Sequence, residues 1–191
     1  MTPLEYPSPQ LADDVAVLRR WAVTDVECAM EGKRYTRDDA LAWITGQWER
    51  QTGGAGLSLA IAEPSGDEAL GCIGLQYRPL AGMAPRGSRL GAELVLEADR
   101  GMLGMGYWVI ERGRRRGLAS HAVSLLSGWA LGRGIARIEA LTEVENVASQ
   151  HVLERSGFVR EGRLAGYLSV TGGRADAFVY ARVAARDTMM A

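Results

Sequence analysis

The chain has 191 residues, which is long enough for one well-buried core and short for two, so a single domain is expected. Its 22 Lys and Arg residues against 23 Asp and Glu residues give a formal net charge of -1. This balance argues against a general polyanion binder, which draws its affinity from many contacts to phosphates. No apolar run approaches the roughly 20 residues that a membrane-spanning helix needs, so no membrane partner is expected either.

Two cysteines, Cys28 and Cys72, lie far apart in apolar surroundings, without the spacing of a disulfide framework or a zinc site. No signal peptide is recognisable, and we expect reduced core thiols in a cytoplasmic protein. The two histidines, His121 and His151, have no third ligand at metal spacing, and no metal site is predicted.

In the first half of the chain we expect a loose segment at residues 1–14, followed by a domain at 15–185 and a tail at 186–191. Residues 15–18 form a short predicted strand. Two helices are predicted to begin at capping boxes, Thr24-x-x-Glu27 and Thr36-x-x-Asp39, because a Ser or Thr followed three residues later by an acidic residue satisfies two helix-end amides. The second helix places Leu41, Ile44 and Trp48 on one face.

Residues 57–62 and 69–77 are apolar, β-prone runs separated by a turn, which predicts an antiparallel hairpin. The segment 78–104 is irregular, with a possible strand at 92–97. A further strand is expected at residues 106–110, and then a helix whose apolar stripe ends before Gly132 and Gly134; the stripe comprises Leu118, Ala122, Leu125, Leu126 and Trp129.

The second half continues with a strand at 137–144, a helix capped by Asn146 and ended by Gly157, and a hairpin of residues 158–170 and 175–183 around the turn at 171–174. Most tryptophans are expected to pack in the core, since aromatic residues at helical or strand spacing usually lie inside: Trp43, Trp48, Trp108 and Trp129. For Trp21 the sequence leaves open whether the side chain is buried.

The stretch "GYWVIERGRRRGLAS" runs from a strand through a basic loop into a helix. Such a junction gathers backbone N–H groups and the positive end of a helix at one point, which favours phosphate. Gly117 has no Cβ to block a ligand, and Arg114, Arg115 or Arg116 could pair with phosphate oxygens. The alternative is a solvated basic turn. A P-loop is excluded because no Gly-Lys-Ser/Thr ending is present, and the nearby glycines precede the strand rather than follow it in dinucleotide-binding spacing.

The residues Arg114-Arg115-Arg116-Gly117-Leu118-Ala119 fit the R/Q-x-x-G-x-G/A signature of the GNAT superfamily of acyl-CoA-dependent N-acyltransferases, and the chain resembles that superfamily. Asn146-x-x-Ser149 followed by "VLERSGFVREG" is similar to its next segment, particularly in the branch with ribosomal-protein-alanine N-acetyltransferases and spermidine or antibiotic acetyltransferases. The resemblance runs from "LRRWAVTDVE" to "GGRADAFVYARV" and departs at 78–104. It implies an α/β fold of the α+β type, with a central mixed, mostly antiparallel sheet flanked by helices.

The resemblance also implies how acetyl-CoA would be held. Backbone groups of Val109 and Ile110 would pair with the pantetheine arm as an added strand would. The pyrophosphate would lie on the loop and the first helical turn, namely Arg114, Arg115, Arg116, Gly117, Leu118, Ala119 and Ser120. Asn146 would touch the pantetheine, cap its helix, or do both.

For catalysis the resemblance points to Ser149 as the group beside the sulfur, with Tyr167 as a second candidate donor to the departing thiolate. Glu139 could be the base that deprotonates the amine, directly or through water. The alternatives are a first-turn helix serine and an exposed strand carboxylate. Two departures bear on this: Leu153 stands where many members have a tyrosine, and Gly104 stands where the branch often has a glutamate.

The sequence therefore predicts an acetyl-CoA-dependent N-acetyltransferase that acts by direct attack of a primary amine, either a protein N-terminus or a small molecule. A non-catalytic acyl-CoA-binding or sensing domain of the same fold is the alternative. A nucleic-acid module built on "RGRRRG" would need more basic surface than the net charge provides. A homodimer is left open.

Overall fold

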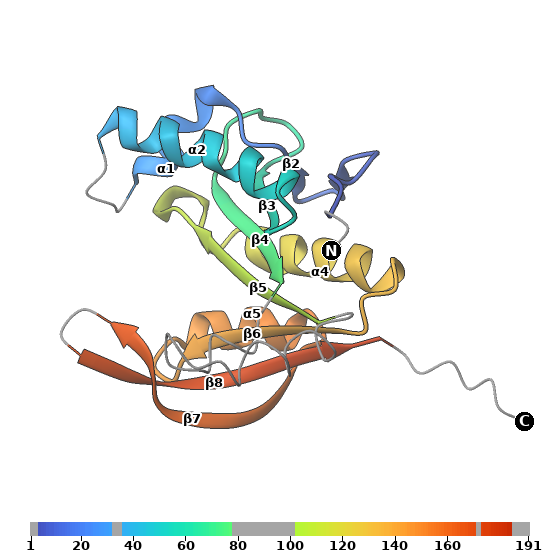
Figure 1. Cartoon of the computed structure of the whole chain (residues 1–191), viewed down its shortest axis with the longest axis vertical. Coiled ribbons are helices and arrows are strands. Elements are labelled where there is room, and N and C mark those ends of the chain that lie inside the picture. Colours follow the sequence, from blue (N-terminus) through green and yellow to red (C-terminus); the bar gives the residue numbers. More distant parts are fainter. Residues whose placement is uncertain (1–3, 32–35, 78–101, 171–172, 185–191) are drawn as a thin grey trace, which may run out of the picture. The chain divides into compact units, whose positions relative to one another are not determined.

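The computed structural model describes residues 4–31, 36–77, 102–170 and 173–184. The chain divides into two compact units, Met1–Gln76 with Met105–Leu126, and Tyr77–Gly104 with Ser127–Ala191. The described chain combines strands and helices, which confirms the mixed α/β class (Figure 1). The domain limits at 15 and 185 stay a prediction.

The first unit is built on strands in the order β1-β2-β3-β4-β5, and the pairings β1–β2, β2–β3 and β3–β4 are antiparallel. The predicted hairpin of residues 57–62 and 69–77 is confirmed as β3 and β4. Several boundaries differ from prediction. A short strand lies inside the supposedly loose segment, the strand predicted at 15–18 lies at 17–19, β4 begins two residues late, and β5 begins four residues early. The bounds are β1 Leu11–Ala12, β2 Val17–Arg19, β3 Gly56–Ala62, β4 Gly71–Tyr77 and β5 Met102–Val109.

The helix α2, Arg37–Thr52, begins at the predicted capping box: Asp39 N donates to Thr36 Oγ1 at 3.2 Å and Thr36 N donates to Asp39 Oδ2 at 2.9 Å. The box predicted at Thr24 is wrong. A 3-10 turn, η1 Val23–Asp25, leads into α1, Val26–Met30. There the Asp25 carboxylate accepts from Ala22 N at 2.8 Å, because two 2.8 Å bonds from Arg19 hold it in place.

The core of the first unit lies where α2 packs on β3 (Figure 1). The helix α4, Leu118–Gly132, adds buried apolar side chains to this unit as far as Leu126. Its fully buried side chains include Ile44, Leu59, Ile73 and Leu126. Gly71 allows β4 to approach β5, because a Cβ there would come within 2.4 Å of the Trp108 carbonyl oxygen. None of the helices in the described ranges is long and apolar enough to cross a membrane.

The second unit pairs its strands antiparallel in the order β6-β8-β7, and α5 packs on β6 and β7 (Figure 1). The predicted caps of α5 are confirmed: Asn146 Oδ1 accepts from Ser149 N at 3.1 Å, and Gly157 follows the helix at φ 79°. The bounds are β6 Arg137–Glu143, α5 Val147–Arg155, β7 Val159–Val170 and β8 Gly173–Val183. The predicted strand at 92–97 lies outside the described residues.

Candidate active site

The basic loop joins β5 to α4 through a left-handed backbone. Arg115 has φ 59° and Gly117 has φ 82°, which lies in the region that glycine tolerates best. His121 N donates to Gly117 O at 3.1 Å, so α4 begins directly after this glycine. Alternating backbone conformations before a helix start form a concave set of N–H groups suited to an anion. A Cβ at Gly117 would make only ordinary contacts, so its backbone angle, and not crowding, requires glycine.

The strand end shows which backbone groups the protein already uses. Ile110 N donates to Leu70 O at 3.0 Å, and Ile110 O accepts from Gly113 N at 3.0 Å. Val109 O accepts from Arg114 Nε at 3.1 Å. A pantetheine arm would therefore find the Ile110 N–H engaged, and it would share the Val109 carbonyl with Arg114.

The arginines of the loop differ in their partners. Arg112 bonds to Glu31, at 3.0 Å, and to Glu68, and these contacts hold it away from the signature residues. Arg116 forms an ion pair with Glu63. Arg114, Arg115 and Arg116 are exposed, whereas Leu118 is buried, and Ala119 and Ser120 are half-buried in the first turn of α4.

His121, on the same turn, lies against the loop. Its Nδ1 is 2.7 Å from Asp13 Oδ2, and Asp14 brings a third ligand atom to within 4.8 Å of these two. The sequence did not indicate this group because Asp13 and His121 are 108 residues apart. Acidic side chains often gather without a cation, so the group by itself is no metal site.

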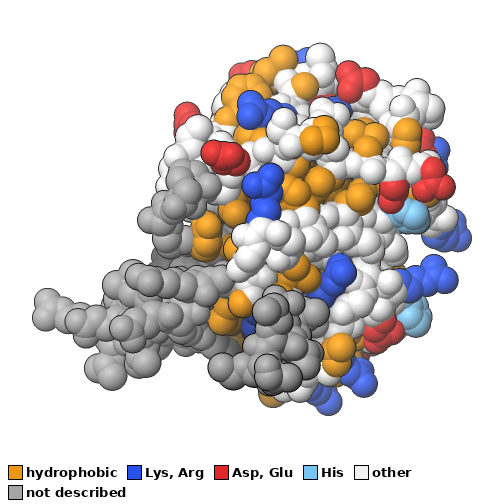
Figure 2. All heavy atoms as spheres, turned by 90° about the vertical axis from the view of Figure 1, so that its right-hand side faces the viewer, with side chains coloured by type: hydrophobic (Ala, Val, Ile, Leu, Met, Phe, Trp, Pro, Cys, Tyr) orange, Lys and Arg blue, Asp and Glu red, His pale blue; other side chains and the backbone are white. Residues whose placement is uncertain are grey.

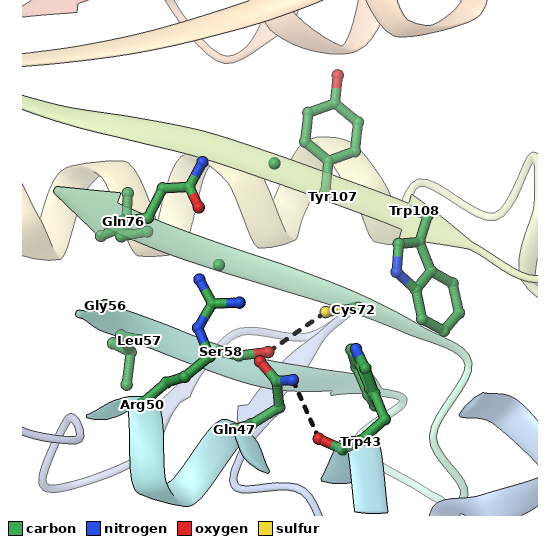
Figure 3. A pocket seen from close by; sticks show the side chains of 13 residues that line it. Trp43, Gln47, Arg50, Gly56, Leu57, Ser58, Cys72, Gln76, Tyr107 and Trp108 are labelled. Carbon is green, nitrogen blue, oxygen red and sulfur yellow. Dashed lines mark hydrogen bonds between the residues drawn. The ribbon is translucent and has the colours of Figure 1, made fainter. Parts of the chain in front are cut away.

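A cavity of ≈ 280 Å³ lies between α2 and strands β3, β4 and β5 of the first unit (Figure 3). Its lining comes from four elements: Trp43, Gln47 and Arg50 of α2, Gly56, Leu57 and Ser58 of β3, Cys72, Gly74, Leu75 and Gln76 of β4, and Gly106, Tyr107 and Trp108 of β5. The lining mixes aromatic rings with amide, hydroxyl and guanidinium groups. A few polar groups in a mostly apolar hollow are typical of small-molecule sites.

The aromatic wall of this cavity is fixed from behind by Trp21, which is 2% exposed. The centroid of its ring lies 5.0 Å from that of Trp43, in an edge-to-face arrangement, and 6.2 Å from that of Trp108. Its Nε1 donates to Ser58 Oγ at 3.2 Å, and that hydroxyl lies 3.5 Å from Cys72 Sγ. The wall is therefore a packed and hydrogen-bonded unit.

These positions correct the expectation that four tryptophans pack in the core. Trp43 and Trp108 line the cavity, Trp48 is 36% exposed, and Trp129 is half-buried under the Arg133 guanidinium, 4.9 Å from the ring centroid. The sequence did carry a signal, since Trp43, Gln47 and Arg50 follow the i, i+4, i+7 spacing of one helical face. Polar groups on an inward face indicate a lined cavity better than a core.

Both cysteines are buried thiols, as predicted. Burial raises the pKa of the Cys28 thiol to about 12, so it stays protonated near neutral pH. Cys72, which is 8% exposed, lines the cavity instead.

The second unit holds the remaining candidates. Asn146 is exposed at the start of α5, and Ser149 is half-buried in the first turn. Leu153 is fully buried in the same helix. The hydrogen bond from Ser149 N to Asn146 Oδ1 confirms the helix-cap role of Asn146, while its contact with a coenzyme stays a prediction.

Glu139 lies on β6 in an ion pair. Arg137 Nε donates to Glu139 Oε1 at 2.8 Å, and Arg137 also donates to Glu161 Oε1 at 3.0 Å. These two carboxylates raise the pKa of the Arg137 guanidinium, with the Glu161 hydrogen bond as the largest cause. To accept a proton from an amine, Glu139 would have to compete with this arginine.

Tyr167 sits in a bulge of the β7–β8 hairpin, where the register shifts between Leu164 and Leu168. Asp176 Oδ1 accepts from Gly166 N at 2.6 Å, and Arg174 donates to Tyr167 O at 2.8 Å. The bonds from Gly166 and then from Arg163 hold the pKa of the Asp176 carboxyl below its usual range. The bulge is thus fixed by charged side chains, and Tyr167 itself is half-buried.

The distribution of charge on the surface agrees with the nearly equal numbers of basic and acidic residues, 22 and 23. Figure 2 shows basic and acidic side chains interspersed on the visible face, without one continuous basic patch. A nucleic-acid surface would gather its lysines and arginines on one face.

Comparison with known proteins gives a family match over most of the chain. A family model described as an acetyltransferase (GNAT) domain matches residues 4–159. The uncharacterized N-acetyltransferase YjdG of Bacillus subtilis (strain 168) is 36% identical over 70 residues, which are 36% of this chain and 42% of that protein. The chain spans less than half the length of the curated relatives that it matches.

Two solved structures show the same fold. The Salmonella typhimurium acetyl transferase that modifies the N-terminal serine of ribosomal protein L7/L12 has a TM-score of 0.71 at 18% identity, covering 91% of this chain and 98% of that one. The microcin C7 self-immunity acetyltransferase MccE, solved with acetyl-CoA and AMP, has a TM-score of 0.70 at 17% identity, covering 90% and 93%. At these identities the likeness concerns the fold alone.

Proposed function

This chain belongs to the GNAT acetyltransferase family, and from that premise we propose that it transfers the acetyl group of acetyl-CoA to a primary amine by direct attack. The observation that carries the proposal is the loop after β5, where Arg115 and Gly117 adopt positive φ immediately before α4. This backbone suits a pyrophosphate, because it turns N–H groups toward one anion at a helix N-terminus. Solved relatives of the same fold include one with acetyl-CoA bound, which supports the choice of ligand.

In the proposed complex Leu118, Ala119 and Ser120 present the first turn of α4 to the pyrophosphate, and exposed Arg114 and Arg115 neutralise its charge. Arg116 would contact the pyrophosphate only if its ion pair with Glu63 were broken. The pantetheine would run along the β5 end through Val109. Asn146 stays a candidate pantetheine contact, as the family resemblance implies.

The chemistry requires a neutral amine, a stabilised oxyanion and a proton or hydrogen bond for the departing thiolate. We assign the thiolate contact to Ser149, with Tyr167 as the second candidate. Glu139 is the proposed base, directly or through water. No metal takes part in this proposal.

The acceptor is a primary amine, either a protein N-terminus or a small molecule. The Salmonella relative modifies a protein N-terminal serine, which supports the first class. The cavity of ≈ 280 Å³ supports the second, because its volume is close to the roughly 300 Å³ at which ligand pockets for small molecules begin.

Calorimetry with acetyl-CoA tests the coenzyme site. Gly117→Asp should abolish binding, because it strains a backbone at φ 82° and adds a negative charge beside the phosphates. Gly117→Ala should weaken binding less, since it brings the strain without the charge. Arg112→Ala should bind as the wild type does, because Glu31 and Glu68 occupy this guanidinium. Equal losses in Gly117→Asp and Arg112→Ala would show that the phosphate site lies elsewhere.

A non-catalytic acyl-CoA-binding domain is the second candidate function. Two observations favour it: Leu153 is buried where many relatives have a tyrosine, and Glu139 is paired with Arg137. Binding of acetyl-CoA without transfer to any amine would support this candidate against the enzyme.

A further inference from the structure

We infer that the cavity beside α2 takes an acceptor amine with two further features, a carboxylate held by Arg50 and a flat apolar group packed at Trp43 and Trp108. Aromatic α-amino acids and their close analogues have this chemistry. The inference rests on the proposed function and narrows its acceptor to the small-molecule class.

The contact of Arg50 with a carboxylate is inferred from the charge of the cavity. Among the described residues, its lining includes one arginine and no aspartate or glutamate. Arg50 extends from the last turn of α2 into the cavity, toward Gln76 on β4 (Figure 3). Six other arginines of the described residues pair with carboxylates of the protein: Arg19, Arg37, Arg112, Arg116, Arg137 and Arg163. Arg50 is exposed on α2 and extends toward a hollow whose described lining holds no such carboxylate, so a ligand can supply one.

The shape of the cavity carries the second step. In Figure 3, Trp43, Trp108 and Cys72 lie toward one end, and Arg50 and Gln76 lie toward the other. The tryptophan end is held rigid by Trp21, which contacts both rings. A rigid aromatic end opposite a cationic end matches a ligand with a flat apolar group at one end and an anion at the other.

The size and charge of the ligand follow from these two ends. A volume of ≈ 280 Å³ is at the lower limit for small-molecule pockets, which fits a single amino acid and leaves little room for a longer chain. One guanidinium, flanked by the neutral amides of Gln47 and Gln76, balances the single charge of a carboxylate. A phosphate monoester carries about two charges near neutral pH and would need a second cation.

The test uses the acetylated products as probes, because they carry no titratable amine that would complicate the comparison. N-acetylphenylalanine and N-acetylphenylalanine amide are titrated by calorimetry into the full chain saturated with CoA. The wild type should bind the acid roughly 10- to 100-fold more tightly than the amide, the range for a hydrogen-bonded charged group. Arg50→Gln should remove this preference, and Arg50→Lys should retain part of it.

Arg155→Gln is the matched control, since Arg155 is exposed in α5 of the second unit and does not line the cavity. It should keep the full preference for the acid. Thermal midpoints of all variants are measured alongside, because Arg50 lies near the α2 C-terminus and its loss could also weaken the helix. A folded Arg50→Gln chain that still prefers the acid would overturn the inference.

Two further outcomes separate this inference from the proposed function. If acetyl-CoA binds but acid and amide bind equally, or an N-acetylserine peptide amide binds more tightly than either, the acceptor is not an amino acid and the proposed function stands. If acetyl-CoA itself gives no heat, the proposed function fails, and this inference fails with it.

Discussion

Ser149 is the residue on which the chemical proposal can be tested with least disturbance of the fold. The hydrogen bond that caps α5 runs from the Ser149 N–H to Asn146 Oδ1, at 3.1 Å, so an alanine keeps it. If the hydroxyl supports the departing thiolate, Ser149→Ala should lower kcat by up to roughly 10²- to 10³-fold, the cost of removing one transition-state donor. Acetyl-CoA affinity should stay near the wild-type value, because the interaction strengthens only as charge develops on sulfur.

Steady-state kinetics together with acetyl-CoA calorimetry measure the two quantities separately. An unchanged kcat would reduce Ser149 to a first-turn helix residue. A fall in acetyl-CoA affinity that matches the fall in kcat would mean that the serine acts in binding.

Single residues were predictable from the sequence where the signal is local. The caps Thr36 and Asn146 and the helix-ending Gly157 act over three or four residues, and each has the expected contact or backbone angle. Thr24 failed because the carboxylate that caps the first turn, Asp25, is held by Arg19. The partners of Glu139 were equally hidden, since Glu161 lies 24 residues beyond Arg137 and meets it only through strand packing.

Among the elements, α2 supplies three residues of the cavity lining, Trp43, Gln47 and Arg50, so the cavity depends on the stability of this helix. Its first turn depends on Asp39, whose carboxylate accepts from Thr36 N and Thr36 Oγ1, at 2.9 and 2.7 Å. The backbone hydrogen bond first, and then the side-chain one, hold the pKa of Asp39 below its usual value.

A lowered carboxyl pKa stabilises the fold at a pH above the unfolded value of about 3.9, and this contribution is lost as the pH falls through the folded value. Asp39→Asn should therefore lower the thermal midpoint at pH 7, and the difference from the wild type should shrink steadily below about pH 4. Thermal unfolding of both proteins across this pH range checks the sign. A difference that stays constant into acid would mean that the charge of Asp39 contributes nothing.

The cavity could not be predicted from the sequence, because its lining comes from four elements that are distant in the chain: α2, β3, β4 and β5. The succession of strand, basic loop and helix could be predicted, because the three are contiguous in sequence there. The α2 spacing of Trp43, Gln47 and Arg50 was legible in the sequence, but only the pairing of β3 with β4 gives those side chains a wall to face.

For the whole molecule, the described residues form two units. The basic loop and the cavity belong to the first, and the proposed catalytic residues belong to the second, together with Asn146: Ser149, Glu139 and Tyr167. The family match at residues 4–159 extends over parts of both. The cytoplasmic location stays a prediction of the sequence, and association into a homodimer stays open.

Acetyl transfer itself is the most direct test of the proposed enzyme. The full chain is incubated with acetyl-CoA and a panel of primary amines that includes aromatic amino acids and N-terminal peptides, and both released CoA thiol and acetylated product are measured. We predict one acetylated amine for each thiol released, at a rate that Gly117→Asp abolishes. Tight binding of acetyl-CoA with no acetylated product from any amine, or thiol release that Gly117→Asp leaves unchanged, would contradict the account.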